Sequence, residues 1–345
     1  MDVDADFVIV GTGSAGAVLA NRLSTDIGTR VVALEAGPAD KDKFIHIPAA
    51  WAKLFRSPLD WDYLTQPQQE LAGREIYWPR GKMLGGSSSI NAMVWTRGFA
   101  ADYDEWGSVA GEDWDFAHVA KYFTTIERGP LIISPQRSPR SSTAAWLKAV
   151  QECGYVVEPP NRAAPEGFCE TFVTQRRGAR WSTADAYLKP VSRRRNLTVL
   201  TEATARRVLF EGTRAVGVEF EHDGRRKAIR AHREVVICGG AINSPQLLLL
   251  SGIGDREQLA AHGIDVVRHA PQVGKNLIDH LCAPLGFDAK RDSPFTGVAS
   301  LARRRTESLP HPRSPAADKP WPIINYLVRR RGMLTSNGAE AYGFI

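Results

Sequence analysis

The first 35 residues alternate between two kinds of apolar pattern. Residues 6–10 form a short apolar run, DFVIV, which is typical of a buried parallel strand. The segment GTGSAG follows, and apolar residues then recur at helical spacing in AGAVLANRLS. A second apolar run, RVVALE, occupies residues 30–35. The pattern therefore predicts a strand, a helix and a second parallel strand.

A different pattern occupies residues 197–238. Segments with alternating apolar residues are broken by Glu-Gly-Thr at 211–213 and by Asp-Gly at 223–224. Such breaks are typical of tight turns between antiparallel strands. We expect a three-stranded antiparallel meander whose last strand, REVVICGG, leads into a second glycine-rich turn and a helix. The whole pattern predicts an α/β fold, a Rossmann-like parallel sheet extended by this meander.

Other regions have weaker patterns. Residues 40–79 are rich in Pro, Trp and Tyr without clear periodicity, which indicates a long ordered excursion that covers a site. In residues 101–127 aromatic side chains recur at helical spacing, and Asp115 is the expected N-cap. Thr143 is the expected cap of another helix, which ends near Gly154.

Composition places the chain among globular proteins. It has 345 residues, of which 43% are apolar and 24% charged, and its net charge is +6. This small basic excess is spread along the chain, so no nucleic-acid partner is expected. The four cysteines show neither a CxxC pair nor metal-like spacing, so we expect no disulfide framework and no metal site.

The sequence also bears on location. Its first residues, Met-Asp-Val-Asp-Ala-Asp, lack the basic segment of a signal peptide, and no apolar run approaches about 18 residues. We therefore expect a cytoplasmic protein without a transmembrane segment. Peripheral association with a membrane surface is compatible with this expectation.

The glycine-rich segment after the first strand indicates a dinucleotide site. In the pattern GxGxxG the first glycine permits a tight turn, the second lets the backbone approach a pyrophosphate, and the third allows close packing of helix and strand. The helix start offers free N–H groups to the phosphates, and an acid at residue 35 can accept from a ribose hydroxyl. This pattern suits FAD or NAD but not NADP. The expected contacts are Gly11, Gly13, Ser14, Ala15, Gly16 and Glu35.

Two longer segments point to a family. Residues 81–98 read GKMLGGSSSINAMVWTRG and closely resemble the first signature of the glucose–methanol–choline (GMC) oxidoreductases. Residues 240–254 read GAINSPQLLLLSGIG and resemble the second signature of that family. In this segment Ser244 is the expected N-cap, with Pro245 at the first helical position and Gly252 as the stop. Further similar phrases lie at 178–188, 196–208, 273–280 and 332–344.

The resemblance implies FAD as the cofactor and extends the predicted contacts. In the family the first signature runs past the pyrophosphate towards the flavin ring, and the residue at position 205 meets the adenine through its backbone. The double glycine at 85 and 86 permits an unusual backbone path close to a ligand. The contacts implied in this way are Met83, Gly85, Gly86, Ser87, Asn91, Ala92, Met93, Val94, Ala205 and Gly240.

The resemblance also implies a domain order. An FAD-binding domain is expected over residues 1–285, interrupted by excursions at about 40–79 and 101–190. Residues 286–345 are then a linker and the beginning of a substrate-binding domain. The Arg-, Pro- and Ser-rich composition of residues 290–322 is typical of such a linker.

The family's chemistry is alcohol oxidation, in which a neutral histidine takes the hydroxyl proton and hydride passes to flavin N5. The resemblance thus implies choline or another primary alcohol as substrate and oxygen or a quinone as electron acceptor. The family's catalytic histidine corresponds to none of the eight here and is expected beyond residue 345, so no catalytic residue is assigned. His280 is expected to be structural, hydrogen-bonded with Asp279.

Two alternatives stand beside this interpretation. The chain is a non-catalytic, truncated flavin-binding remnant, or it is an NAD-dependent enzyme. The NAD hypothesis accounts only for the segment from Gly11 to Glu35 and leaves both long signatures unexplained.

Overall fold

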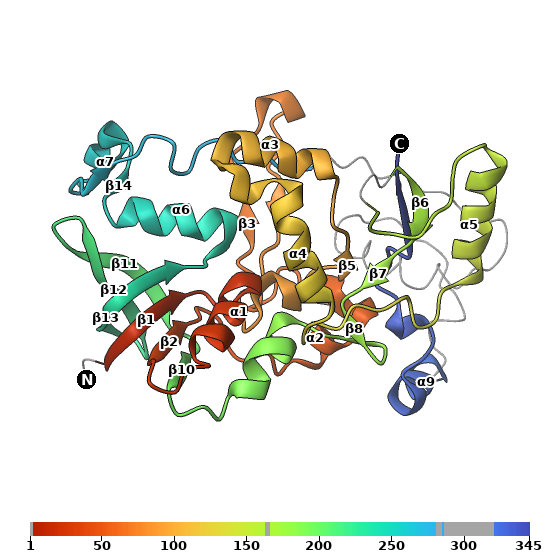
Figure 1. Cartoon of the computed structure of the whole chain (residues 1–345), viewed down its shortest axis with the longest axis horizontal. Coiled ribbons are helices and arrows are strands. Elements are labelled where there is room, and N and C mark those ends of the chain that lie inside the picture. The colour runs from red at the N-terminus through yellow and green to blue at the C-terminus, as the bar shows by residue number, and fades with distance from the viewer. Residues whose placement is uncertain (1–2, 163–165, 281–284, 286–320) are drawn as a thin grey trace. The chain divides into compact units, whose positions relative to one another are not determined.

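The computed structural model describes residues 3–162, 166–280, 285 and 321–345. Its contacts divide the chain into two compact units, and Figure 1 labels most of their longer helices and strands. The first unit comprises Met1–Lys41, Phe55–Ile90 and Ser182–Cys282, and the second comprises Asp42–Leu54, Asn91–Trp181 and Ala283–Ile345. Most of the expected linker lies outside the described residues, and the expected domain limit near residue 285 stays a prediction.

A six-stranded sheet forms the centre of the first unit, in the order β10-β2-β1-β13-β12-β11 (Figure 1). Strands β10, β2, β1 and β13 run parallel, while β13, β12 and β11 form an antiparallel meander. All four residues of β2 are buried, as expected for a parallel strand covered on both faces. The predicted α/β class is confirmed. The strands are β1 (Val3–Val10), β2 (Val31–Leu34), β10 (Leu197–Leu200), β11 (Thr204–Glu211), β12 (Arg214–His222) and β13 (Arg225–Ile237).

The predicted meander requires one correction. Residues 197–200 do not begin its first strand but form β10, which pairs in parallel with β2. The chain turns at Glu202, whose φ is +56°, and the Ala203 amide then donates to the Glu35 carbonyl. The sequence pattern missed this break because both β10 and β11 alternate apolar and polar residues. This periodicity cannot show that the two strands pair with different neighbours in the sheet.

Helices α1 (Ser14–Leu23) and α6 (Gly240–Leu250) pack against the sheet. Small buried residues of α1, among them Gly16 and Ala17, let it approach closely, and Leu247 of α6 joins the apolar core of the sheet. The predicted start of α6 is wrong: the helix begins at Gly240, and Pro245 lies inside it. The glycine turn after β13 leads directly into helical conformation, which takes precedence over the local Ser-Pro preference. The predicted stop at Gly252, with φ +84°, is confirmed.

The remaining elements of the first unit are short. The excursion contributes a two-stranded pair, and the second signature ends in another. These elements are β3 (Tyr63–Leu64), η2 (Gln69–Leu71), β4 (Tyr77–Trp78), η3 (Gly86–Ser89), η5 (Ala184–Leu188), η6 (Lys189–Val191), β14 (Ile253–Gly254), α7 (Arg256–Ala261) and β15 (Arg268–His269).

The second unit combines helices with three two-stranded pairs, β5 with β7, β6 with β16 and β8 with β9. Its helices are α2 (Lys43–His46), η1 (Pro48–Lys53), α3 (Ala100–Ala110), η4 (Glu112–Trp114), α4 (Phe116–Glu127), α5 (Ser141–Glu152), α9 (Trp321–Arg329) and η8 (Met333–Thr335). Its strands are β5 (Val94–Trp95), β6 (Gly167–Glu170), β7 (Phe172–Val173), β8 (Gln175–Arg176), β9 (Ala179–Arg180) and β16 (Ala341–Phe344).

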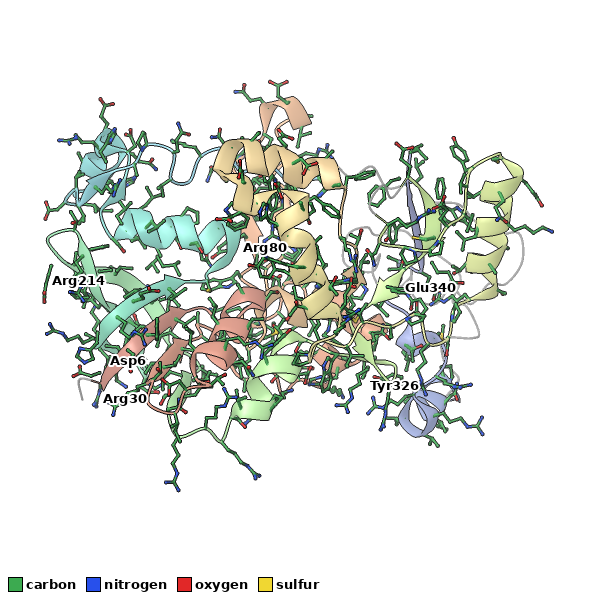
Figure 2. The ribbon with its side chains drawn as sticks, viewed as in Figure 1. Asp6, Arg30, Arg80, Arg214, Tyr326 and Glu340 are labelled. Carbon is green, nitrogen blue, oxygen red and sulfur yellow. The ribbon has the colours of Figure 1, made fainter. Side chains whose placement is uncertain are left out.

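The two predicted helix caps of this unit have different outcomes. Asp115 caps α4 as predicted, because its carboxylate accepts from the His118 amide at 2.8 Å. Thr143, in contrast, lies inside α5, and its hydroxyl donates at 2.6 Å to the buried carboxylate of Glu340 (labelled in Figure 2). The cap prediction failed because the hydroxyl's acceptor lies 197 residues away in the sequence. Across the described part of the chain, no helix is long and apolar enough to cross a membrane.

Candidate functional site

A large cavity opens in the first unit where three neighbouring strands end. Its volume is about 760 Å³, and Val10, Leu34 and Ile237, the last residues of β1, β2 and β13, all line it. The chain leaves β1 towards β2 on one side, while β13 lies on the other, so the cavity stands at the switch point of the sheet. Ligands of open α/β sheets bind at this position. The cavity is also within the size range of small-molecule sites.

The GTGSAG turn forms one wall of the cavity. Gly11 has φ +94°, and a Cβ there would lie 2.5 Å from the Cys238 carbonyl oxygen, so only glycine fits. Gly13, Ser14 and Ala15 line the cavity at the start of α1, which no side chain caps. This arrangement gives the wall the positive end of a helix dipole and uncapped N–H groups, which suits an anion.

The second glycine-rich segment closes against this turn. Gly86 has φ +51°, and a Cβ on it would come within 2.7 Å of the Gly13 Cα. The Gly85 amide donates to the Thr12 carbonyl at 3.0 Å and so holds the two segments together. Because neither segment carries a side chain at this crossing, the two backbones approach closely and form a narrow cradle of main chain in the cavity wall.

Glu35 lies at the end of β2 and is only 5% exposed. One carboxylate oxygen accepts from the Thr12 amide at 3.0 Å and from the Thr12 hydroxyl at 2.8 Å, and the other accepts from the Gly37 amide at 3.0 Å. Burial raises the pKa of the Glu35 carboxyl, although these hydrogen bonds favour its ionised form. Glu35 is also among the residues that line the cavity.

Nine of the predicted contact residues come together at this cavity. Its lining includes Gly11, Gly13, Ser14, Ala15, Glu35, Gly86, Ser87, Ala205 and Gly240. Three others belong to the same unit but not to the cavity wall. Gly16 packs against the Gly11 carbonyl, Met83 is fully buried, and Gly85 makes the turn before Gly86.

The last four predicted contacts form a separate turn in the second unit. The Asn91 side-chain oxygen accepts from the Met93 amide at 3.0 Å and from Arg180 at 2.8 Å. Arg180, itself only 1% exposed, also donates to the Asn91 and Ile45 carbonyls. Met93 is buried with φ +60°, while Val94 begins β5 and is 38% exposed. The flavin contact of Asn91, Ala92, Met93 and Val94 stays a prediction.

Several cavity residues were not predicted individually. Trp61 and Tyr63 stack with their ring centroids 5.8 Å apart, and both line the cavity together with Arg80, which Figure 2 labels. The Tyr63 hydroxyl donates to the Asn243 side-chain oxygen at 2.5 Å, which joins the excursion to α6. Burial raises the pKa of Tyr63, so it stays a neutral donor. The aromatic composition of residues 40–79 indicated a segment that covers a site. It did not indicate which of its aromatic side chains line the cavity.

None of the described histidines is among the residues that line the cavity. The His280 side chain is exposed, and its expected bond with Asp279 is made by the main-chain N–H, which donates to the carboxylate at 2.9 Å. His118 pairs with Asp115 on α4, and His311 lies outside the described residues. No group of three or more His, Cys, Asp or Glu side chains that could hold a metal occurs in the ranges described.

Comparison with known proteins gives consistent matches. A family model described as GMC oxidoreductase matches residues 5–282. An uncharacterised GMC-type oxidoreductase of Mycobacterium tuberculosis is 61% identical over 361 residues, which cover 100% of this chain and 65% of that protein. The mitochondrial choline dehydrogenase of Homo sapiens is 46% identical over 296 residues, covering 80% of this chain and 50% of that protein.

Among solved structures, pyridoxine 4-oxidase from Mesorbium loti matches with a TM-score of 0.74 and 34% sequence identity. The match covers 78% of this chain and 56% of that chain. The chain therefore spans between about half and two thirds of the length of the proteins that it matches.

Proposed function

The chain belongs to the GMC oxidoreductase family, whose members are FAD-binding flavoenzymes, and from this membership we propose that its cavity holds FAD for the oxidation of an alcohol. The substrate that we propose is choline or another primary alcohol, since the choline dehydrogenase of Homo sapiens is among the relatives. The electron acceptor that we propose is oxygen or a quinone. When bound, FAD would accept the hydride that leaves the alcohol carbon.

One observation carries the proposal: both glycine-rich segments and Glu35 meet at a single cavity. The main-chain cradle of Gly13 and Gly86 suits a pyrophosphate, because no side chain of either residue occupies the crossing. The uncapped start of α1 provides N–H groups for its charge. Glu35 lines the cavity where contact with a ribose hydroxyl is expected, and Ala205 lines it where adenine contact is expected.

We further propose that the base for the alcohol proton is not a histidine of this sequence. A base must come within hydrogen-bond reach of the substrate hydroxyl. His280 is the one histidine within a family-like phrase, and its exposed side chain makes no hydrogen bond in the described structure. His46 and His118 lie on helices α2 and α4, while His222, His232 and His269 lie on strands, and none of these five lines the cavity.

The test is an anaerobic reduction experiment. The FAD-loaded chain is mixed with choline and a panel of primary alcohols while the flavin's visible band is followed. We expect no bleaching by the chain itself. We expect bleaching once the chain is joined to the remaining C-terminal part of the Mycobacterium tuberculosis relative. Proton transfer to a positioned base is worth about 10²–10⁴ in rate, so the difference should be unmistakable.

Two results would contradict the proposal. A joined protein that holds FAD but is bleached by none of the alcohols counts against alcohol oxidation. Bleaching of the chain itself that disappears in His280→Ala counts against the assignment of the base. Dithionite reduction of each sample serves as the control, because it shows that the bound flavin can be reduced.

A further inference from the structure

We propose that α9 and the arginines around it form a docking surface for an anionic phospholipid membrane. Helix α9 exposes four aliphatic side chains, Ile323 at 57%, Ile324 at 44%, Leu327 at 65% and Val328 at 76%. They are spaced i, i+1, i+4 and i+5, so they form one continuous stripe along the helix. Contiguous exposed apolar surface of this kind marks an interaction site.

The opposite side of α9 is anchored within the second unit. Tyr326 is 1% exposed, and its hydroxyl donates to the His46 carbonyl at 3.1 Å. The Arg330 carbonyl accepts from Arg137 Nε at 2.7 Å, which ties the C-terminal end of the helix to the segment before α5. The helix is therefore held with its apolar stripe outward, and the exposure of the stripe is not a result of a loose helix.

Arginines border the stripe at the C-terminal end of α9. Arg329, Arg330 and Arg331 are exposed and directly follow the stripe of α9, the helix whose buried Tyr326 Figure 2 labels. Arg137 donates through Nε to the Arg330 carbonyl at 2.7 Å. Arg177 adjoins Gly178, where a Cβ would lie 2.7 Å from the Arg137 side chain. In the described part of the chain, none of these five arginines forms an ion pair with an acidic residue.

This combination favours a membrane over other partners. An aliphatic stripe beside unpaired arginines matches a helix that lies in the interface of an anionic bilayer, with aliphatic groups among the acyl chains and guanidinium groups at the phosphates. A nucleic-acid surface is usually more polar and places basic groups, not four aliphatic side chains, at its centre. The positive charge of the arginines and the apolar area of α9 together therefore favour an anionic membrane as the partner of this surface.

The experiment uses the FAD-loaded protein and sedimentation with vesicles. The vesicles contain phosphatidylcholine alone or with roughly one third phosphatidylserine. We expect binding to the anionic vesicles that weakens with added salt. Arg329→Glu/Arg331→Glu should reduce the partition coefficient by at least roughly 25-fold, since each arginine near the surface contributes about fivefold. Leu327→Asp should reduce it by roughly tenfold or more, because an aliphatic insertion is lost.

The chain offers a matched control in its other described arginine triplet. Arg193 and Arg195 are exposed, and the neighbouring turn, which Arg194 and Asn196 bond, exposes one large aliphatic side chain, Ile27, where α9 exposes four. Arg193→Glu/Arg195→Glu makes the same change in charge and should leave vesicle binding nearly unchanged. Arg330 and Arg194 are kept in both variants, because Arg330 lies over Tyr326 and Arg194 donates to the Asn21 carbonyl.

Each contrary outcome overturns the proposal. Absence of binding to anionic vesicles does so directly, and equal losses in the two double variants mean that net charge alone is responsible. Leu327→Asp could leave vesicle binding unchanged while both double arginine variants weaken it. The protein then binds polyanions in general through its basic surface, and DNA should compete with the vesicles. If vesicle binding is absent and Leu327→Asp abolishes self-association in ultracentrifugation, the surface is instead an interface between copies of this chain.

Discussion

Gly13→Val should abolish FAD binding while the fold stays intact. A Cβ on Gly13 would meet only the Gly86 Cα, at 3.8 Å, so the protein itself has room for a side chain. That room is part of the cavity, where we propose that the backbone meets the pyrophosphate. A branched side chain there should weaken binding by at least about 100-fold, or about 2.8 kcal/mol. A flavin fluorescence titration measures the loss.

Gly28→Val is the matched control for this prediction. Gly28 lies in an exposed turn of the same unit, and the nearest atom to a Cβ there is an Asp26 carboxylate oxygen at 3.5 Å. The same change in size should therefore leave FAD affinity unaltered. If Gly13→Val binds FAD as tightly as the parent protein, the proposed place of the pyrophosphate is wrong.

Arg180→Met should destabilise the second unit. The Arg180 side chain is 1% exposed and donates to the Ile45 carbonyl at 2.8 Å and to two Asn91 oxygens at 2.8 and 2.7 Å. Methionine fills much of the volume but donates nothing. Asn91 is exposed and can turn to water, whereas the Ile45 carbonyl stays buried without its donor. We expect a loss of roughly 2–3 kcal/mol in the free energy of unfolding.

Urea unfolding of Arg180→Met, compared with Arg177→Met, measures this effect. Arg177 lies in the turn between β8 and β9 and is exposed, so its replacement should change the free energy of unfolding by less than about 0.5 kcal/mol. Equal stabilities of the two variants would show that the Arg180 hydrogen bonds do not hold the Asn91 turn in place.

The segments that could be predicted are those specified by neighbouring residues. Around Gly11 the apolar run, the glycine spacing and the following helical period all lie within one short stretch, and each favours the same strand–turn–helix. The Asp115 cap belongs to the same class, because its acceptor and its donor are three residues apart. In such cases local chemistry and the fold agree.

Features made by distant residues could not be predicted. The Arg180 bond to Asn91 joins residues 89 apart, and the bond from Tyr63 to Asn243 joins residues 180 apart. Each of these side chains, taken alone in the sequence, is compatible with an exposed position. At Ser244 the local preference for a helix start even pointed to the wrong residue, since the turn at Gly240 had already begun the helix.

Alkylation of Cys238 tests the central claim, that FAD occupies this cavity, most directly. Cys238 follows β13 and lines the cavity, whereas Cys153 is exposed in the second unit and serves as an internal control. Burial raises the pKa of the Cys238 thiol, so the reaction is run at alkaline pH and followed by mass spectrometry. With saturating FAD, alkylation of Cys238 should slow at least roughly tenfold while that of Cys153 is unchanged. Equal rates at Cys238 with and without bound FAD would contradict the account.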